Sequence, residues 1–427
     1  MLKKILATIA TRYFIAALNL LLIFMNGKVL GVHGMGVVGV IYASANIAVI
    51  FSSVLCGNTI VYYMNRYPLR FVFWPACVWA FGGSAVACGV MALCGALPEG
   101  FGAEVYGLSV LLSLVAIHAR VLLGKDHIKS FNATFMIQGG GLFFILLYMY
   151  YVAGQRDVQG YLWGLYLTNG IAWIVSLLLI FPFFFRQTPE PTATAPPIIK
   201  RLREMFVYGL WSSADNLAEG LTIRLNYFLL QRLGGYVQVG LLDAGTRISE
   251  SVWHISRSIS SISYSQIAKT SDPETQRRMT LRFFKGAYCA VICVTGLIWL
   301  IPEWVYTDYL FTAEFQGIRK VIRGLSVGIV ALGANSVLSH YFIGTGKVRY
   351  STACSCLGLV VLLLAGYFLI PRYGVFGSAL STSIAFSAML LFSLTLFVKQ
   401  THTPLCELLP TKADFRTLKR KFKDSEI

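Results

Sequence analysis

Charged side chains are scarce in this chain of 427 residues. They make up 13% of the sequence, whereas hydrophobic residues make up 56%. A soluble globular domain carries roughly 25% charged residues, so the composition indicates that lipid is the main solvent. The hydrophobic runs also lack the strict alternation of apolar and polar residues that is typical of a β-barrel strand. The sequence therefore predicts membrane-spanning helices.

The sequence also lacks the patterns of a disulfide framework, a metal site or a nucleotide site. Eight of the nine cysteines stand in apolar runs, where a thiol behaves as a small hydrophobic group. Gly34–Gly39 fits a dinucleotide-binding pattern, but no strand precedes it. Gly344–Lys347 resembles a phosphate loop without its first glycine and without the following Ser or Thr. We expect no catalytic residue, no metal and no cofactor beyond a coupling ion (H+ or Na+).

Runs of about 20 mostly apolar residues, the length that spans hydrocarbon, recur along nearly the whole chain. We expect an all-α polytopic membrane protein that crosses the bilayer about twelve times. The first run has no convincing cleavage site before Gly27, so we expect it to stay in the protein. The predicted spans are 12–31, 36–63, 71–97, 103–123, 131–153, 160–185, 205–232, 236–262, 281–302, 320–345, 349–370 and 374–398.

One proline-rich stretch divides these spans six and six. It holds Pro189, Pro191, Pro196 and Pro197 among Thr and Ala. No other predicted loop is long enough to fold as a domain. The expected organisation is an N-lobe at 1–185, a cytoplasmic linker at 186–204, a C-lobe at 205–399 and a basic cytoplasmic tail at 400–427.

The net charge of +17 is distributed unevenly along the chain. With the N-terminus in the cytoplasm, 26 Lys and Arg fall in cytoplasmic segments and 7 in outer segments. The positive-inside rule accounts for this asymmetry, so the charge does not indicate nucleic acid. An even number of spans then places both termini in the cytoplasm.

Acidic residues are missing from the interior of the predicted spans of the first half. The only acids there are Glu99, Glu104, Asp126 and Asp157, in predicted loops or at a predicted span end. A charge at the bilayer centre costs about 2.5–3.5 kcal/mol on insertion scales, so an intramembrane charge usually marks a pathway or a pair. The intramembrane carboxylates all fall in spans 205–232 and 236–262: Asp215, Glu219, Asp243 and Glu250.

Polar side chains form stripes on four of the predicted spans. In span 236–262 the stripe covers an arc of about 80° at ~100° per residue. In span 205–232, Arg224 points away from the stripe. The stripes are Arg12, Asn19 and Asn26; Tyr42, Asn46 and Ser53; Asp215, Glu219, Thr222 and Asn226; and Asp243, Arg247, Glu250, His254 and Arg257.

These stripes have two interpretations. In the first, span 236–262 holds a closed ladder of ion pairs, Asp243–Arg247, Arg247–Glu250 and Glu250–His254, at helical spacings of three and four residues. In the second, the arginines face a water-filled cavity and receive an anionic head group, since guanidinium binds phosphate through two parallel hydrogen bonds. Interfacial rather than ligating roles are expected for three residues near span ends: His118, Arg120 and His340.

The two halves resemble each other weakly. Leu30-Gly31 followed by Val38–Ala43 parallels Leu233-Gly234 followed by Val239–Ala244. Both stretches lie between the first and second spans of their half. Such duplication is common in transporters and places a substrate site between the halves.

The layout resembles the polysaccharide (oligosaccharide) flippases of the MOP superfamily, called Wzx-type transporters, which are related to MATE drug antiporters and lipid II flippases. The resemblance covers nearly the whole chain. Its most telling stretches are Lys28–Ala43, Val239–Ile259 and Tyr341–Ser383, which share glycine placement and helix spacing with that superfamily.

The resemblance implies two pseudo-symmetric six-helix lobes around a central cavity lined by spans 12–31, 36–63, 205–232 and 236–262. It implies alternating access in the cytoplasmic (inner) membrane of a bacterium, for O-antigen, capsule or exopolysaccharide biosynthesis. The partners would be an undecaprenyl-diphosphate-linked oligosaccharide, membrane lipids, a polysaccharide polymerase and glycosyltransferases, with the chain acting as a monomer. The implied head-group and cavity residues are Arg12, Asn19, Asn26, Tyr42, Asn46, Arg224, Asn226, Arg247, His254 and Arg257, and the implied ion-coupling residues are Asp215, Glu219, Asp243 and Glu250.

Two other functions compete with this interpretation. One is efflux of small organic molecules in the manner of MATE antiporters. The other is a polytopic glycosyltransferase or ligase acting on lipid-linked glycans. Such an enzyme needs a sizeable outer loop with an acid, and the best candidate, Glu303–Gly317 with Asp308 and Glu314, is short.

Overall fold

All regular elements in the described part of the chain are helices. The computed structural model describes residues 2–64, 66–185, 197–267, 270 and 272–408, without the side chains of residues 2–13, 254, 261, 262, 265, 405 and 406. No strand occurs among these residues, which confirms the all-α fold class. The elements are α1 (Leu2–Cys56), α2 (Asn58–Tyr63), α3 (Leu69–Leu93), α4 (Gly102–Gly124), α5 (Ile128–Phe135), η1 (Met136–Gly140), α6 (Gly141–Tyr151), α7 (Val158–Ile180), η2 (Phe181–Phe184), α8 (Ile198–Ile267), α9 (Pro273–Leu300), η3 (Val305–Leu310), η4 (Ala313–Phe315), α10 (Ile318–Gly344), α11 (Val348–Thr401) and η5 (Leu405–Leu408).

Three long helices are each two helices joined at one glycine. Gly31 in α1, Gly235 in α8 and Gly374 in α11 have φ values of 67°, 70° and 54°. Side chains disfavour this left-handed region, whereas glycine enters it freely. The short loops expected at these three places are therefore single-residue kinks. We call the resulting segments arms 1a (2–30), 1b (32–56), 8a (198–234), 8b (236–267), 11a (348–373) and 11b (375–401).

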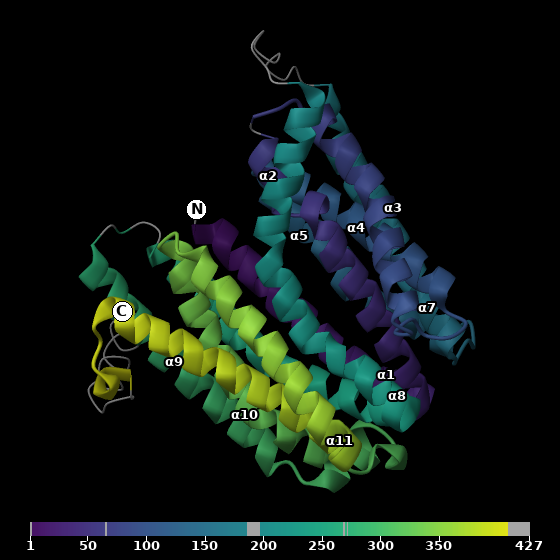
Figure 1. Cartoon of the computed structure of the whole chain (residues 1–427). Helices are drawn as coiled ribbons and strands as arrows, with labels where there is room; N and C mark the ends of the chain where they lie inside the picture. The colour runs from purple at the N-terminus through teal and green to yellow at the C-terminus, as the bar shows by residue number, and fades with distance from the viewer. Residues whose placement is uncertain (1, 65, 186–196, 268–269, 271, 409–427) are drawn as a thin grey trace.

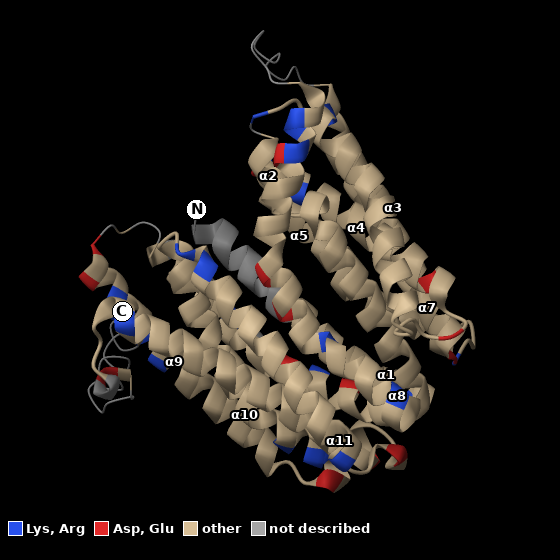
Figure 2. Ribbon diagram, viewed as in Figure 1, with Lys and Arg blue, Asp and Glu red and all other residues tan. Residues whose placement is uncertain are grey.

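Eight helices of the described residues are long and apolar enough to cross a membrane. Two of them contain the kinks of α1 and α11, and α8 is not among the eight. Figure 2 shows charged residues gathered near helix ends, with long uncharged stretches in α3, α4 and α10. The twelve crossings stay a prediction, which assigns one crossing to each arm and one each to α3, α4, α5–α6, α7, α9 and α10.

The helices form two groups that diverge toward one end of the molecule. Figure 1 shows α3, α4, α5 and α7 on one side and α9, α10 and α11 on the other, with α1 and α8 between them. The two groups converge where α1 and α8 meet, and they diverge toward the end that holds the start of α1. Arm 8a contacts both groups, since Phe206 packs edge-on against Trp79 of α3 while Tyr227 is buried with Val321 of α10. The expected lobe boundaries at 185 and 205 stay a prediction.

The two halves cross through a reciprocal backbone contact at their converging end. A Cβ atom on Gly36 would collide with the carbonyl oxygen of Tyr236, and one on Gly240 would collide with that of Val32. Such a self-complementary contact is typical of a two-fold relation. This contact relates Gly36 to Gly240, and the same offset relates the kink glycine Gly31 to the kink glycine Gly235. The repeat predicted from the sequence paired Gly31 with Gly234 and Gly39 with Gly240, so its register was wrong. Gly39 instead packs against Asp243.

The segment between α9 and α10 covers this converging end. The Glu314 carboxylate accepts a hydrogen bond of 3.0 Å from the backbone N–H of Val32, the first residue of arm 1b. Phe311 packs edge-on against Phe24 and fills the space above Gly27. A helix N-terminus gains from both a hydrogen-bond acceptor and a negative charge. Glu314 thus joins the C-terminal half to the start of arm 1b.

We expect Glu314→Ala to lower the free energy of unfolding by about 1 kcal/mol, because Val32 loses its acceptor. Glu314→Gln keeps an acceptor for the Val32 N–H, so its free energy of unfolding should fall by less. Thermal denaturation of the purified protein in detergent measures both changes. Asp308→Ala is the matched control, since Asp308 accepts a hydrogen bond only from its neighbour Thr307 among the contacts of the described residues. Equal melting temperatures for Glu314→Ala and Asp308→Ala would contradict the capping role.

Candidate functional site

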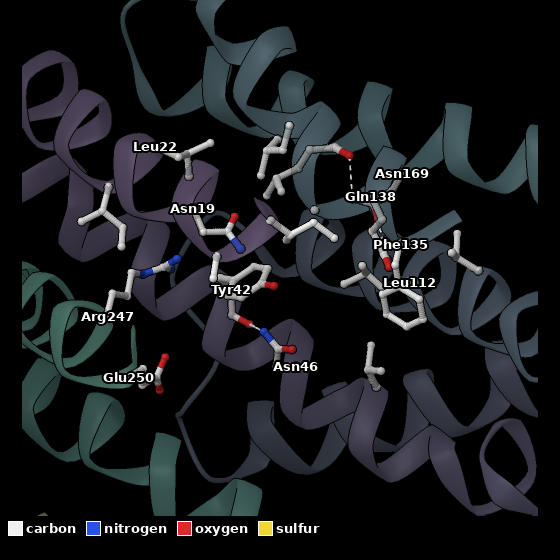
Figure 3. Close-up of a pocket in the computed structure, with 18 of the residues that line it drawn as sticks. Asn19, Leu22, Tyr42, Asn46, Leu112, Phe135, Gln138, Asn169, Arg247 and Glu250 are labelled. Atoms are coloured by element: carbon white, nitrogen blue, oxygen red, sulfur yellow. Dashed lines mark hydrogen bonds between the residues drawn. The ribbon is translucent and has the colours of Figure 1, made fainter. Parts of the chain in front are cut away.

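A cavity lies between the two groups of helices. It has two adjoining chambers, of about 450 and 460 Å³. Chamber 1 is lined by Asn19, Tyr42 and Arg247 with residues of α4, η1 and α7, as Figure 3 shows in close-up. Chamber 2 is lined by Ser53, Arg120, Glu219, Trp253 and Arg257 with their neighbours. The two chambers share five lining residues and so adjoin each other: Asn46, Val49, Ala116, Arg224 and Glu250.

Arms 1a, 1b, 8a and 8b each contribute residues to the cavity lining. Asn19 comes from arm 1a, and Tyr42 and Asn46 come from arm 1b. Asn46 donates to the carbonyl oxygen of Tyr42 at 2.7 Å, which ties its amide to its own helix and leaves the amide oxygen toward the chamber (Figure 3). Arms 8a and 8b contribute the charged residues.

Three arginines of α8 are each held by a carboxylate of the same helix. Arg247 Nε donates to Asp243 Oδ2 at 2.8 Å, and the Tyr227 hydroxyl donates to Asp243 Oδ1 at 3.0 Å. The Asp243 side chain is 2% exposed and that of Arg247 18% exposed. Burying two charges is stable only when hydrogen bonds satisfy them, and this pair meets that condition.

The other two pairs connect arm 8a to arm 8b. Arg224 lies 3.4 Å from Glu250, and Arg257 lies 3.6 Å from Glu219. Both distances exceed that of the Asp243 pair, and the Arg257 side chain is 50% exposed. Of the ladder expected along one span, the described side chains show the Asp243–Arg247 pair and no Arg247–Glu250 pair, while the side chain of His254 lies outside them. Glu250 pairs across the kink with Arg224, which a helical wheel of one span cannot reveal.

The stripe on arm 8a turns mostly away from the cavity. Asp215 accepts hydrogen bonds from Ser351 and Ser355 of arm 11a, at 2.9 and 2.6 Å. The Asn226 amide donates to Ser378, Ser381 and Thr382 of arm 11b. These contacts hold α8 against α11, so only Glu219 of that stripe lines the main chambers. Arg224, which lies on the other side of arm 8a from that stripe, lines both of them.

Asn26, another predicted cavity residue, does not line the main chambers. Asn26 is 5% exposed and accepts a hydrogen bond of 3.1 Å from the Tyr150 hydroxyl. Its amide thus links arm 1a to α6. The side chains of Arg12 and His254 lie outside the described residues, so their predicted roles stay predictions.

Residues of α4, η1 and α7 form a wall of the cavity that was not predicted from the sequence. Gln138 in the π-helical turn η1 donates to Asn169 of α7 at 3.0 Å, and both line chamber 1 (Figure 3). A π-helical turn widens the helix and often occurs at functional sites. Arg120 of α4, expected at the membrane interface, lines chamber 2. The spacing of Ser113, Ala116 and Arg120 is helical and could have indicated this face.

The two histidines expected at the interface have partners in the protein interior. His118 is 1% exposed and lies 2.8 Å from the Ser176 hydroxyl, between Phe73 and Trp173. His340 lies 2.7 Å from the carbonyl oxygen of Ser336. Among the described residues, no group of three His, Cys, Asp or Glu side chains is placed to hold a metal ion.

Comparisons with known proteins place this fold. No family model matches the chain. It is 21% identical over 299 residues, 67% of the chain, to "Uncharacterized membrane protein MJ1068" of Methanocaldococcus jannaschii. It is 20% identical over 190 residues, 43% of the chain, to a "Putative O-antigen transporter" of Shigella flexneri. The chain spans about half the length of these two relatives, 57% and 44% respectively.

Solved structures match over almost the whole chain. An inward-facing multidrug resistance MATE family transporter of the MOP superfamily matches with a TM-score of 0.69 at 13% identity, over 91% of this chain and 94% of that one. The lipid II flippase MurJ, in an inward closed conformation, matches with a TM-score of 0.63 at 12% identity, over 94% and 89%. The sequence resemblance is thereby confirmed at the level of the fold: the chain has the fold of the MOP-superfamily transporters.

Proposed function

We propose that this chain is a flippase that moves a lipid-linked oligosaccharide with an anionic head group across the membrane. The observation that carries the proposal is the pair of adjoining chambers between the two halves, lined by Arg120, Arg224, Arg247 and Arg257. Arginine suits a diphosphate because its planar fork donates two parallel hydrogen bonds. The similarity to MurJ and to the Shigella protein supports a lipid-linked substrate.

The orientation of the chain in the membrane sets the side from which the substrate would enter. We place the diverging end of the helices in the cytoplasm, with both termini, because the predicted cytoplasmic segments carry most of the Lys and Arg. The substrate would enter there as undecaprenyl diphosphate linked to a glycan, in the inner membrane of a bacterium. A polymerase and glycosyltransferases would act on the same substrate, and the chain would act as a monomer.

Glu219 is our preferred candidate for an ion-coupling group. It lines chamber 2, its side chain is 27% exposed, and its arginine lies 3.6 Å away. Asp215 and Asp243 are occupied by shorter contacts. A carboxylate in a loose pair can exchange its partner for a proton or Na+ at the smallest loss of native contacts.

One observation favours efflux of small organic molecules as a second candidate. Three of the four cavity arginines are paired with carboxylates, so the described part of the cavity is less cationic than the sequence suggested. The enzyme alternative has less support, because the acids of the outer segment have structural contacts. Glu314 accepts from Val32, and Glu303 accepts from the N–H of Gly317.

In a host whose copy of this chain is deleted, we expect loss of the cell-surface polysaccharide and accumulation of its lipid-linked precursor on the cytoplasmic side. The wild-type chain and Arg319→Gln should restore the polysaccharide, whereas Arg257→Gln should restore little of it. Arg319 is a matched control because its guanidinium contacts the Trp299 carbonyl oxygen and does not line either chamber. An intact surface polysaccharide after deletion, with increased sensitivity to organic dyes, would favour efflux instead.

A further inference from the structure

The charge balance of the cavity points to Arg120 of α4. Arg224, Arg247 and Arg257 each lie within 3.6 Å of a carboxylate of α8. Within the part of the chain that the structure describes, Arg120 has neither an ion pair nor a hydrogen-bond acceptor. The four acids of the N-terminal half lie outside the cavity lining. Arg120 therefore supplies the positive charge that the α8 carboxylates do not balance.

The position of Arg120 is set by the helix that carries it. Ser113, Ala116 and Arg120 follow one another at helical spacing on one face of α4, and all three line chamber 2. The small side chains of Ser113 and Ala116 leave room beside the guanidinium. Arg120 is half-buried, so it is neither fully solvated nor packed into a core. An arginine held this way without a counter-ion loses hydration and gains no partner.

The opposite wall of the chamber carries Arg257. Its guanidinium stacks over the Trp253 ring at 3.8 Å and lies 3.6 Å from Glu219. This is the longest and most exposed of the three pairs of α8. Arg120 belongs to the N-terminal half and Arg257 to the C-terminal half, so an anion in chamber 2 meets one arginine from each side.

We propose that Arg120 determines the charge selectivity of the cavity, by binding, opposite Arg257, the phosphate or diphosphate group of the transported lipid. This inference rests on the proposed function and names the residue that makes the cavity select an anion. The three α8 pairs then keep the rest of the cavity neutral and polar, which suits a glycan. An anion supplies the counter-charge that Arg120 lacks, and the guanidinium can donate to two of its oxygens.

The test uses the purified full-length protein in detergent with inorganic pyrophosphate as the probe. Pyrophosphate should raise the melting temperature of the wild type. Arg120→Gln should weaken pyrophosphate binding by about tenfold or more, since it removes charge-assisted hydrogen bonds. Arg120→Lys should retain part of the binding. Arg66→Gln is the matched control, because Arg66 is an exposed residue of the same half that lies over the Tyr62 ring and lines neither chamber.

The variants also report on folding. Without pyrophosphate, Arg120→Gln should melt at or above the wild-type temperature, because a half-buried charge without a partner is removed. A lower melting temperature without pyrophosphate would show a structural role and overturn the inference. Equal pyrophosphate affinity for the wild type and Arg120→Gln would overturn it as well, as would a wild type that pyrophosphate does not stabilise.

Failure of this inference is distinguishable from failure of the proposed function. If wild-type vesicles translocate a lipid-linked glycan and Arg120→Gln vesicles do so at the same rate, only the role of Arg120 is wrong. If wild-type vesicles translocate none, the flippase proposal itself is wrong. Slow translocation by Arg120→Gln, with normal translocation by Arg66→Gln, supports both.

Discussion

Replacing Gly36 by alanine should strongly destabilise the folded protein. The added Cβ would collide with the carbonyl oxygen of Tyr236 and lie 3.0 Å from the backbone nitrogen of Gly240. Both atoms belong to the backbone of arm 8b, so no side-chain rotation can relieve the clash. Overpacking a well-packed contact costs about 1–3 kcal/mol and sometimes more. Here arms 1b and 8b would have to separate, so we expect the upper end of that range.

The two-fold character of the contact predicts the same effect for a second variant. Gly240→Ala should have the same effect, because its Cβ would collide with the carbonyl oxygen of Val32. The double variant should lose less stability than the two single variants lose together, since one displacement of the arms relieves both clashes. The yield of monodisperse protein and its melting temperature measure these losses.

Gly82→Ala in α3 is the matched control for both glycine variants. A Cβ at Gly82 meets no atom within 4 Å, so alanine should be tolerated there. Alanine is also the better helix former by about 1 kcal/mol. If Gly36→Ala and Gly82→Ala melt at the same temperature, the close crossing of arms 1b and 8b is wrong.

Replacing Asp243 by asparagine should destabilise the protein by about 3 kcal/mol, the lower end of the range for breaking a buried ion pair. The variant keeps the size of the side chain but leaves Arg247, whose side chain is only 18% exposed, without its counter-charge. The loss of stability should decrease in the order Asp243→Asn, Glu250→Gln and Glu219→Gln. The reason is that the nitrogen–oxygen distance of the ion pair lengthens from 2.8 to 3.4 to 3.6 Å in that order. Thermal denaturation of the three variants in one detergent measures this order.

A second substitution tests whether the unpaired charge is the cause. Asp243→Asn combined with Arg247→Met should regain most of the lost stability, since replacing a buried pair by apolar groups is often nearly neutral. The same double variant should not regain transport, because Arg247 lines chamber 1. Losses of equal size for Asp243→Asn and Glu219→Gln would contradict the assigned pairing.

The membrane-spanning character could be predicted from the sequence because length and hydrophobicity are local properties. Asn19, Tyr42 and Asn46 were also identified as cavity residues, since a polar stripe on an apolar helix needs a polar neighbour. Asp215 and Asn226 also have polar neighbours, but these neighbours belong to α11 and not to the cavity. Their partners are serines and a threonine of α11, more than 130 residues away, and no helical wheel of α8 can show them.

The other features of the site depend on how the helices pack, which the sequence alone does not show. Arg120 lies four residues before the end of α4, so the sequence placed it at the interface, but α4 brings it to chamber 2. The Arg224–Glu250 pair requires the kink at Gly235, which places arm 8a beside arm 8b. The repeat register also depended on which glycine bends the helix. Gly234 and Gly235 are indistinguishable in sequence, and only the backbone conformation separates them.

Translocation by the purified protein in vesicles tests the flippase proposal most directly. The vesicles contain a fluorescent undecaprenyl-diphosphate-linked oligosaccharide and are treated with a quencher that does not cross the membrane. With the wild-type chain, we predict that the lipid in the inner leaflet becomes accessible to the quencher, and that Arg247→Ala and Arg257→Ala slow this strongly while Arg319→Ala does not. Accessibility equal to that of protein-free vesicles under every H+ and Na+ gradient would contradict the proposal.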